Sequence, residues 1–216
     1  MRAILKIILV WLPVIAWAQS PTPGLVVQGS IGVPYTFPAR LSFRQAGLHD
    51  FSHQARFAAE PFVPPWYWDA YAAWRGPQGE YGARLTHHKV LLVNFTPDVP
   101  RFQVTHGFNM LSVFARKDLK WAEVIVGTGV IIGHPETRIR GLENTRVGIF
   151  DGGYFVTGPA FDVGLGRRYF VAPWFFLHAE ARTSWSYVRF PIGGGDVRFQ
   201  ALSAHLKVGT GFFLHP

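Results

Sequence analysis

Three short segments of the chain combine histidine with other polar residues in a way that could bind a metal or transfer a proton. They are Thr86-His87-His88-Lys89, Thr105-His106-Gly107-Phe108-Asn109 and Gly133-His134-Pro135-Glu136. Imidazole nitrogens and carboxylate oxygens bind divalent metals, and a histidine oriented by a carboxylate can act as a general base. The chain has no cysteine and no His-Glu-x-x-His segment. A site here therefore depends on whether the fold brings the three segments together.

The elements that must position these segments are β-strands. Alternation of polar and apolar residues with a period of two is typical of half-buried strands. It predicts strands at residues 24–33, 62–75, 81–93, 101–115, 121–132, 154–165, 174–189 and 197–214. In the strand at 174–189, His178, Glu180 and Arg182 share one face and apolar residues occupy the other. A polar inner face and an apolar outer face indicate a transmembrane barrel, so we predict an all-β, eight-stranded antiparallel up-and-down transmembrane β-barrel.

The N-terminal residues 1–18 have the features of a secretory signal peptide. Arg2 and Lys6 give a basic start, residues 4–15 are mostly apolar, and Ala16-Trp17-Ala18 has the form that signal peptidase cleaves. Residues 19–216 then form one barrel domain. An exported barrel of this kind is expected in the outer membrane of a Gram-negative bacterium. Its Phe-rich end, residues 209–216, resembles the strand that such barrels present to the barrel assembly machinery during insertion.

The composition limits the classes of partner that the protein is expected to bind. The formal net charge is +8, but Lys and Arg are scattered along the chain, which argues against a nucleic-acid ligand. Excess positive charge outside an outer membrane favours the anionic phosphates of lipopolysaccharide and other outer-membrane lipid as partners. The 23 glycines and 16% aromatic residues suit a barrel wall with aromatic belts. The oligomeric state is left open.

An eight-stranded barrel has an interior that side chains fill, so no open pore is expected. Charges in such an interior must be paired, because an unpaired buried charge is costly. The residues predicted to form a paired internal network are Arg84, Glu123, Asp162, Glu180, Arg182 and Lys207.

With both termini in the periplasm, the outer loops are residues 34–61, 94–100, 133–153 and 190–196. This topology brings the three histidine segments to the outer end of adjacent strands. Strict alternation turns His88 into the barrel and His87 and His106 toward lipid. In the strand at 101–115 it puts Arg101, Gln103, Thr105 and Asn109 on the inner face, and Phe102, Val104, Phe108 and Met110 on the outer face with His106.

A serine hydrolase arrangement is a second candidate. Ser203 and His205 lie two apart on one strand face, and Glu180 is on the adjacent strand. Outer-membrane lipid A deacylases carry His-x-Ser, however, and here the order is reversed. The position also lies deep toward the periplasm, away from outer-leaflet lipid.

The chain resembles the lipid A oxidase-like family of small outer-membrane barrels over roughly residues 78–214. The resemblance is carried by Thr-His-His-Lys within residues 81–90, by Gly-Phe-Asn-Met-Leu within residues 104–111, and by the Gly-rich residues 126–130 followed by His134-Pro135. It implies oxygen-dependent oxidation of the proximal glucosamine of lipid A at the outer leaflet. The corresponding positions are His87, His88, Lys89, His106, Asn109, His134 and Glu136.

Under this interpretation the candidate catalytic residues are His88, His106, Asn109, His134 and Glu136. A divalent metal is the cofactor to consider, with His88, His134 and Glu136 as its ligands. Lys89, Arg138 and Arg140 would hold lipid A phosphates.

Other classes of function and fold stay open from the sequence. One is a non-enzymatic structural or interaction barrel, and another is a small channel for hydrophobic solutes. A channel needs an opening in the wall, which Pro64, Pro65 or Pro159 would favour because proline removes a ladder hydrogen bond. A soluble, lipocalin-like barrel would reverse every inward and outward face.

Overall fold

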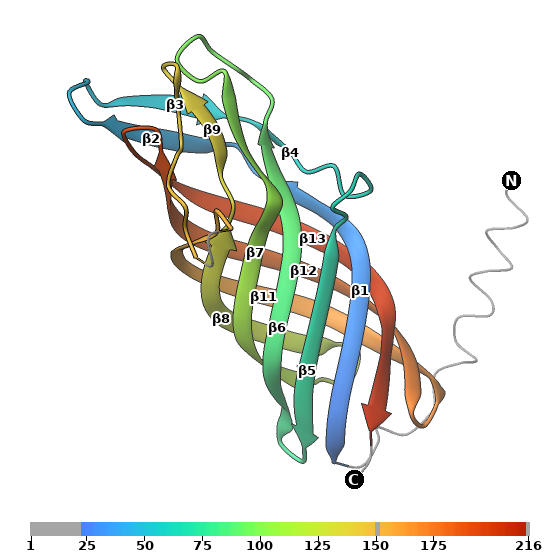
Figure 1. Ribbon diagram of the computed structural model, residues 1–216. Coiled ribbons are helices and arrows are strands. Elements are labelled where there is room, and N and C mark those ends of the chain that lie inside the picture. The colour runs from blue at the N-terminus through green and yellow to red at the C-terminus, as the bar shows by residue number, and fades with distance from the viewer. Residues whose placement is uncertain (1–22, 150–151, 215–216) are drawn as a thin grey trace, which may run out of the picture.

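The computed structural model describes residues 23–149 and 152–214, and all of its regular structure is β-strand. Eight antiparallel strands form a closed ring, as the sequence predicted (Figure 1). In ring order they are β1 (Gly24–Thr36), β5 (Trp68–Gly76), β6 (Gly79–Leu92), β7 (Arg101–Asp118), β8 (Glu123–Gly133), β11 (Phe155–Ala172), β12 (Phe175–Ile192) and β13 (Gly195–Leu214). The ring closes where β13 pairs with β1. The predicted signal peptide lies outside the described residues.

The outer loops carry short strands that the sequence pattern did not predict. β2 (Ala39–Gln45) pairs with β13 and with β3 (Phe51–Ala55), and β4 (Phe57–Ala58) pairs with β6. β9 (Glu136–Ile139) pairs with β7 and with β10 (Leu142–Glu143). The reason is that β13 extends beyond β1 and β7 extends beyond β8, and an unpaired strand edge favours a further strand. β2 pairs with Gly195–Arg198 of β13, above the segment that β1 covers.

The predicted second strand is shorter than expected. It begins at Trp68 and not at residue 62, so Pro64 and Pro65 lie outside the strands. Pro159 lies within β11, where it faces Val130 of β8 just after a register shift between Val156 and Gly158. The pairs between β11 and β12 begin only at Ala160, so Pro159 is paired with β8 and not with β12. A lateral channel therefore stays an alternative hypothesis.

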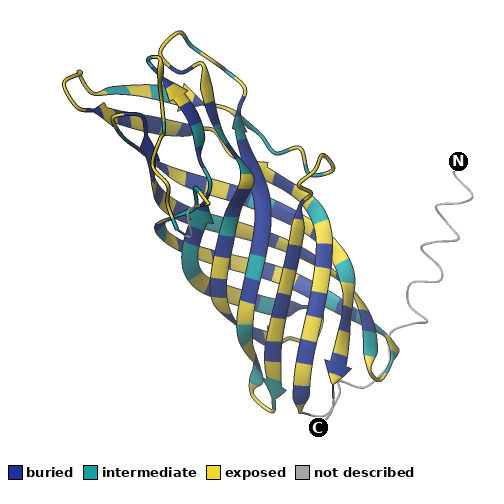
Figure 2. Cartoon of the chain, viewed as in Figure 1, coloured by how far each residue is buried: buried dark blue, intermediate teal, exposed yellow. Residues whose placement is uncertain are grey.

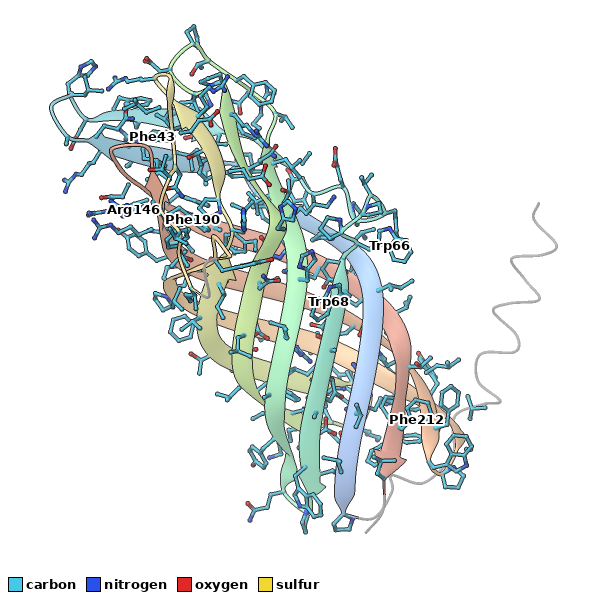
Figure 3. The ribbon with its side chains drawn as sticks, viewed as in Figure 1. Phe43, Trp66, Trp68, Arg146, Phe190 and Phe212 are labelled. Carbon is cyan, nitrogen blue, oxygen red and sulfur yellow. The ribbon has the colours of Figure 1, made fainter. Side chains whose placement is uncertain are left out.

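The wall has an apolar outside and a charged inside. On β1, Leu25, Val27 and Ile31 are exposed, whereas Gln28 and Ser30 between them are buried, and Figure 2 shows the same alternation around the ring. This is the burial pattern of a barrel whose outside meets lipid, and it is opposite to that of a soluble barrel. Aromatic side chains occur toward both ends of the wall, among them Trp66 and Trp68 at one end and Phe212 at the other (Figure 3). Among the described residues, no helix has the length and hydropathy needed to span a bilayer.

The predicted internal ion network is confirmed. Arg84 lies within 4 Å of Asp69, Asp162 and Glu180. The network extends through three further cations, Arg116, Arg182 and Lys207, and through Arg168 with Glu80 and Glu123 near the short turns. Every side chain in it is at most 10% exposed. Charge inside the barrel is therefore paired, as burial demands.

Above this network the interior is apolar, which corrects the prediction for β7. Phe102, Val104, Phe108 and Met110 point into the barrel and are at most 3% exposed, although alternation placed them on the lipid side. They join an apolar cluster that includes Phe43 and Phe190 near the rim (Figure 3). The prediction for β7 was wrong because it assumed a polar interior along the whole strand, whereas the interior near the outer loops is an apolar cluster.

Candidate functional site

The histidine site forms at a bulge in β7. Between Val104 and Phe108, β7 has four residue steps, whereas its partner β6 covers the same stretch in two. β8 and β9 on the other side also use fewer residues, because Phe108 pairs with Gly133 and Gln103 with Glu136. The extra residues bend the strand, and Gly107 adopts φ 127° there, a backbone conformation that favours glycine. The bulge turns the His106 side chain outward, where it is 59% exposed.

Glu136, the first residue of β9, is the anchor of the site. His106 Nδ1 lies 2.9 Å from its Oε1, and the Thr105 hydroxyl donates to the same oxygen at 2.6 Å. Gln103 Nε2 donates to Oε2 at 2.9 Å, and Arg101 pairs with that oxygen too. Partial burial raises the pKa of Glu136, but the hydrogen bonds from Thr105, Gln103 and His106 outweigh it and lower the pKa below its ordinary value. The carboxylate is therefore ionised at neutral pH.

His134 completes the cluster from the link between β8 and β9. Its ring lies 5.1 Å from that of His106 and 5.2 Å from that of Tyr154, whose hydroxyl donates to the His106 carbonyl at 3.0 Å. A Cβ at Gly153 would lie 2.7 Å from the His134 ring, so glycine makes room for the imidazole. His134 Nδ1 is buried and has no hydrogen-bond partner among the described residues.

The arrangement supports two kinds of chemistry. One ligand atom each from His106, His134 and Glu136 lies within 4.8 Å of the others, and two imidazoles with a carboxylate match the donor set of a divalent transition metal. Without a metal, Glu136 orients His106 through Nδ1 and leaves Nε2 on an exposed ring to exchange a proton.

His87 and Asn109 lie on the same outer wall beside the bulge. His87 Nδ1 lies 2.8 Å from Asn109 Oδ1, and its ring stacks on Trp68 at 5.7 Å. The Asn109 amide folds over Gly107, because a Cβ there would approach its Nδ2 to 2.2 Å. Both residues therefore border the His106 segment.

The structure does not bring His88 to this site. His88 points into the barrel, where its ring lies 5.0 Å from Phe108 and 5.2 Å from His205. The space among these residues leaves no room for a water molecule. His106, and not His88, lies beside His134 and Glu136. Strict alternation predicted His88 inside the barrel and His106 outside, and both directions are confirmed.

The three cations expected to bind phosphate are also dispersed. Each has a carboxylate within 4 Å: Lys89 with Glu60, Arg138 with Glu143, and Arg140 with Asp98. Lys89 is buried, whereas Arg138 lies on the exposed face of β9. No common phosphate site is formed by these three residues.

The serine arrangement is not assembled either. His205 Nε2 lies 3.0 Å from Ser184 Oγ, whereas Ser203 Oγ pairs with the Thr36 hydroxyl at 3.0 Å. His205 is 1% exposed inside the barrel, away from any lipid substrate.

Sequence reasoning missed four contributors to the site: Arg101, Gln103, Thr105 and Tyr154. Gln103 and Thr105 precede His106 at alternating positions of the predicted strand. Their shared polar face could therefore have indicated that they belong to the site. Tyr154 follows a long segment after Glu136, and nothing in the linear pattern predicts its contact with His134.

Comparison with known proteins places the chain only by its shape. No family model matches it, and no curated protein sequence matches it. Among solved structures it is similar to Neisserial surface protein A, with 14% identity over 88% of this chain and 97% of the other, at a TM-score of 0.45. It is also similar to the outer membrane protein OprG from Pseudomonas aeruginosa (9% identity, 91% and 98% coverage, TM-score 0.46) and to the outer membrane protein AlkL (13%, 93% and 94%, 0.46). At these low values function has to be argued from this chain's own residues.

Proposed function

We propose that the protein is an outer-membrane β-barrel of a Gram-negative bacterium that modifies lipid A at the outer leaflet. The observation that supports this is the place of the His106, His134 and Glu136 cluster. It lies on the outward side of the wall at the loop end of the barrel, whereas the interior is filled by ion pairs and apolar side chains. A lipid in the outer leaflet can reach the outside of the wall without entering the barrel.

The residues supply proton transfer and orientation at a sugar hydroxyl. His106 Nε2 accepts the hydroxyl proton, and Glu136 stabilises the imidazolium that results through Nδ1. If a divalent metal were bound instead, His106, His134 and Glu136 would hold it and His106 would be a ligand and not the base; the metal would then polarise the substrate oxygen. Oxidation of the glucosamine at C1, which the family resemblance implies, breaks the C1–H bond and passes its two electrons to molecular oxygen, which gives a lactone and hydrogen peroxide. Hydrolysis of the lactone by water then gives an aminogluconate that is heavier than the sugar by one oxygen.

The test is mass spectrometry of lipid A from aerobically grown cells with and without the expressed protein. We expect an added mass of one oxygen with the wild type, and its loss with His134→Gln and with Glu136→Gln. The matched control is His49→Gln, which changes an exposed loop histidine outside the cluster. Heat-modifiable migration on gels verifies that each variant is folded. Unmodified lipid A in membranes that contain folded wild-type protein would overturn the proposal.

A non-enzymatic interaction barrel is the second candidate, and one feature of Glu136 favours it. Four donors already surround its two oxygens, which is what a structural tie between β7 and β9 requires. In that case Glu136→Gln would weaken the rim and leave lipid A unchanged. The same mass spectra and a stability measurement therefore distinguish the two candidates.

A further inference from the structure

A second polar feature lies on another part of the wall. A groove of about 600 Å³ forms between the β2–β3 hairpin and strands β12 and β13. Its lining includes Arg40, Arg44 and Arg198, with Tyr187 and Gln200 beside them. In the ring, β8 and β11 separate β12 from β7, so this groove is distinct from the histidine site.

The groove carries more positive charge than its acidic residues balance. Asp196 is shared between Arg198, at 2.8 Å, and Arg189, at 2.7 Å. Arg44 pairs with Asp50 at 3.0 Å. Arg40 is exposed and makes no ion pair among the described residues. Four arginines and two aspartates thus leave a net positive surface that is open to solvent.

The height of the groove on the wall points to its ligand. Along β13, outward positions change from Leu202 to Gln200 and then to Arg198. Along β12, which pairs with it, Tyr187 lies opposite Gln200 and Arg189 opposite Arg198. Each outward step along a strand covers about 7 Å, so Arg198 lies roughly 13 Å along the strand beyond Leu202, the last exposed apolar residue of β13. Anionic headgroups lie at this level when acyl chains cover the apolar wall below.

We propose that this groove binds the phosphate groups of lipopolysaccharide in the outer leaflet. Guanidinium groups bind phosphate in a bidentate geometry, and the Arg40 guanidinium has no side-chain partner within the part of the chain that the structure describes. The β2–β3 hairpin creates the site, because Arg40 and Arg44 come from β2 and Arg198 comes from β13, far along the chain. The proposal shares the outer-leaflet location with the proposed function but needs no catalysis, so either can fail alone.

The test measures binding of bis-phosphorylated lipid A to the purified barrel in a zwitterionic detergent, by native mass spectrometry. We expect the double variant Arg40→Ser, Arg198→Ser to bind about tenfold more weakly, since charge-assisted hydrogen bonds are lost at an exposed site. The matched control is Lys117→Ser, Lys120→Ser, which removes two exposed positive charges at the opposite end of the barrel. It should leave the affinity unchanged.

Further arms identify the source of the phosphate. Lipid A from which both phosphates have been removed should bind about as weakly as the double variant does. Arg40→Lys, Arg198→Lys keeps the charge and should retain part of the affinity. The proposal is overturned if the Arg40→Ser, Arg198→Ser variant binds lipid A normally, or if Lys117→Ser, Lys120→Ser loses as much affinity as that variant does. It is also overturned if dephosphorylated lipid A binds as well as bis-phosphorylated lipid A. Binding of inorganic phosphate without binding of lipid A would overturn it too.

Discussion

Glu180 occupies the centre of the buried ion network and gives the sharpest test of the fold. Its Oε1 lies 2.8 Å from Lys207 Nζ and 3.2 Å from Arg84 Nη1, and its Oε2 lies 3.2 Å from Arg116 Nη2. The side chain is 1% exposed. The ion network described above contains five fully buried cations, Arg84, Arg116, Arg168, Arg182 and Lys207, and five anions, Asp69, Glu80, Glu123, Asp162 and Glu180. Replacing Glu180 by leucine leaves one positive charge buried without compensation.

The expected cost of Glu180→Leu is about 3–5 kcal/mol in the free energy of unfolding, the range for removing one partner of a buried ion pair. The assay is reversible denaturant unfolding of the barrel in lipid vesicles, with the folded fraction read from gel migration. Glu143→Leu is the matched control, because Glu143 is 55% exposed in its pair with Arg138. That change should cost about 1 kcal/mol or less.

A second substitution tests the electrostatic origin of this loss. Glu180→Leu combined with Lys207→Met removes one anion and one cation, so the interior is neutral again. The double variant should be more stable than Glu180→Leu alone, because the two residues are in direct contact and their effects are not additive. If Glu180→Leu unfolds within about 0.5 kcal/mol of the wild type, as a surface substitution does, the reasoning is refuted.

Three further predictions follow from the packing and the charges. Gly211→Ala should destabilise the barrel by about 1–3 kcal/mol, because the new Cβ would lie 2.1 Å from the Phe176 ring. Gly29→Ala on the neighbouring strand is the control, since its Cβ would meet nothing within 4 Å and the change should be neutral in the same unfolding assay. The lowered pKa of Glu136 in the folded protein means that its ionised form adds stability above the ordinary carboxyl pKa of 4.5, and that this is lost as pH falls through the lower folded value. The stability difference between wild type and Glu136→Gln should therefore be present at pH 7 and vanish in acid; a difference that persists unchanged at pH 2 would contradict it. The purified barrel should show no ion conductance in planar bilayers, because its interior is filled, and stable single-channel currents would show that an open path exists.

The amino-acid sequence by itself determined the strands and most of their faces. Alternation along β12 was enough to place His178, Glu180 and Arg182 inside, and all three are at most 4% exposed. The need to pair buried charge then predicted the internal network before any contact was known. These features follow from local rules, because side-chain direction in a regular strand depends only on position parity.

Tertiary structure decided what local rules cannot express. The bulge at Gly107 exists because β7 has more residues than both neighbours over the same span, and register is a property of paired strands. It brought His106 to Glu136, whereas His88 lies inside the barrel as alternation along β6 predicts. The arginine groove likewise arises only when β2 pairs with β13, which joins residues 150 or more positions apart. Sequence thus specified which residues are available for chemistry, and strand pairing decided which of them meet.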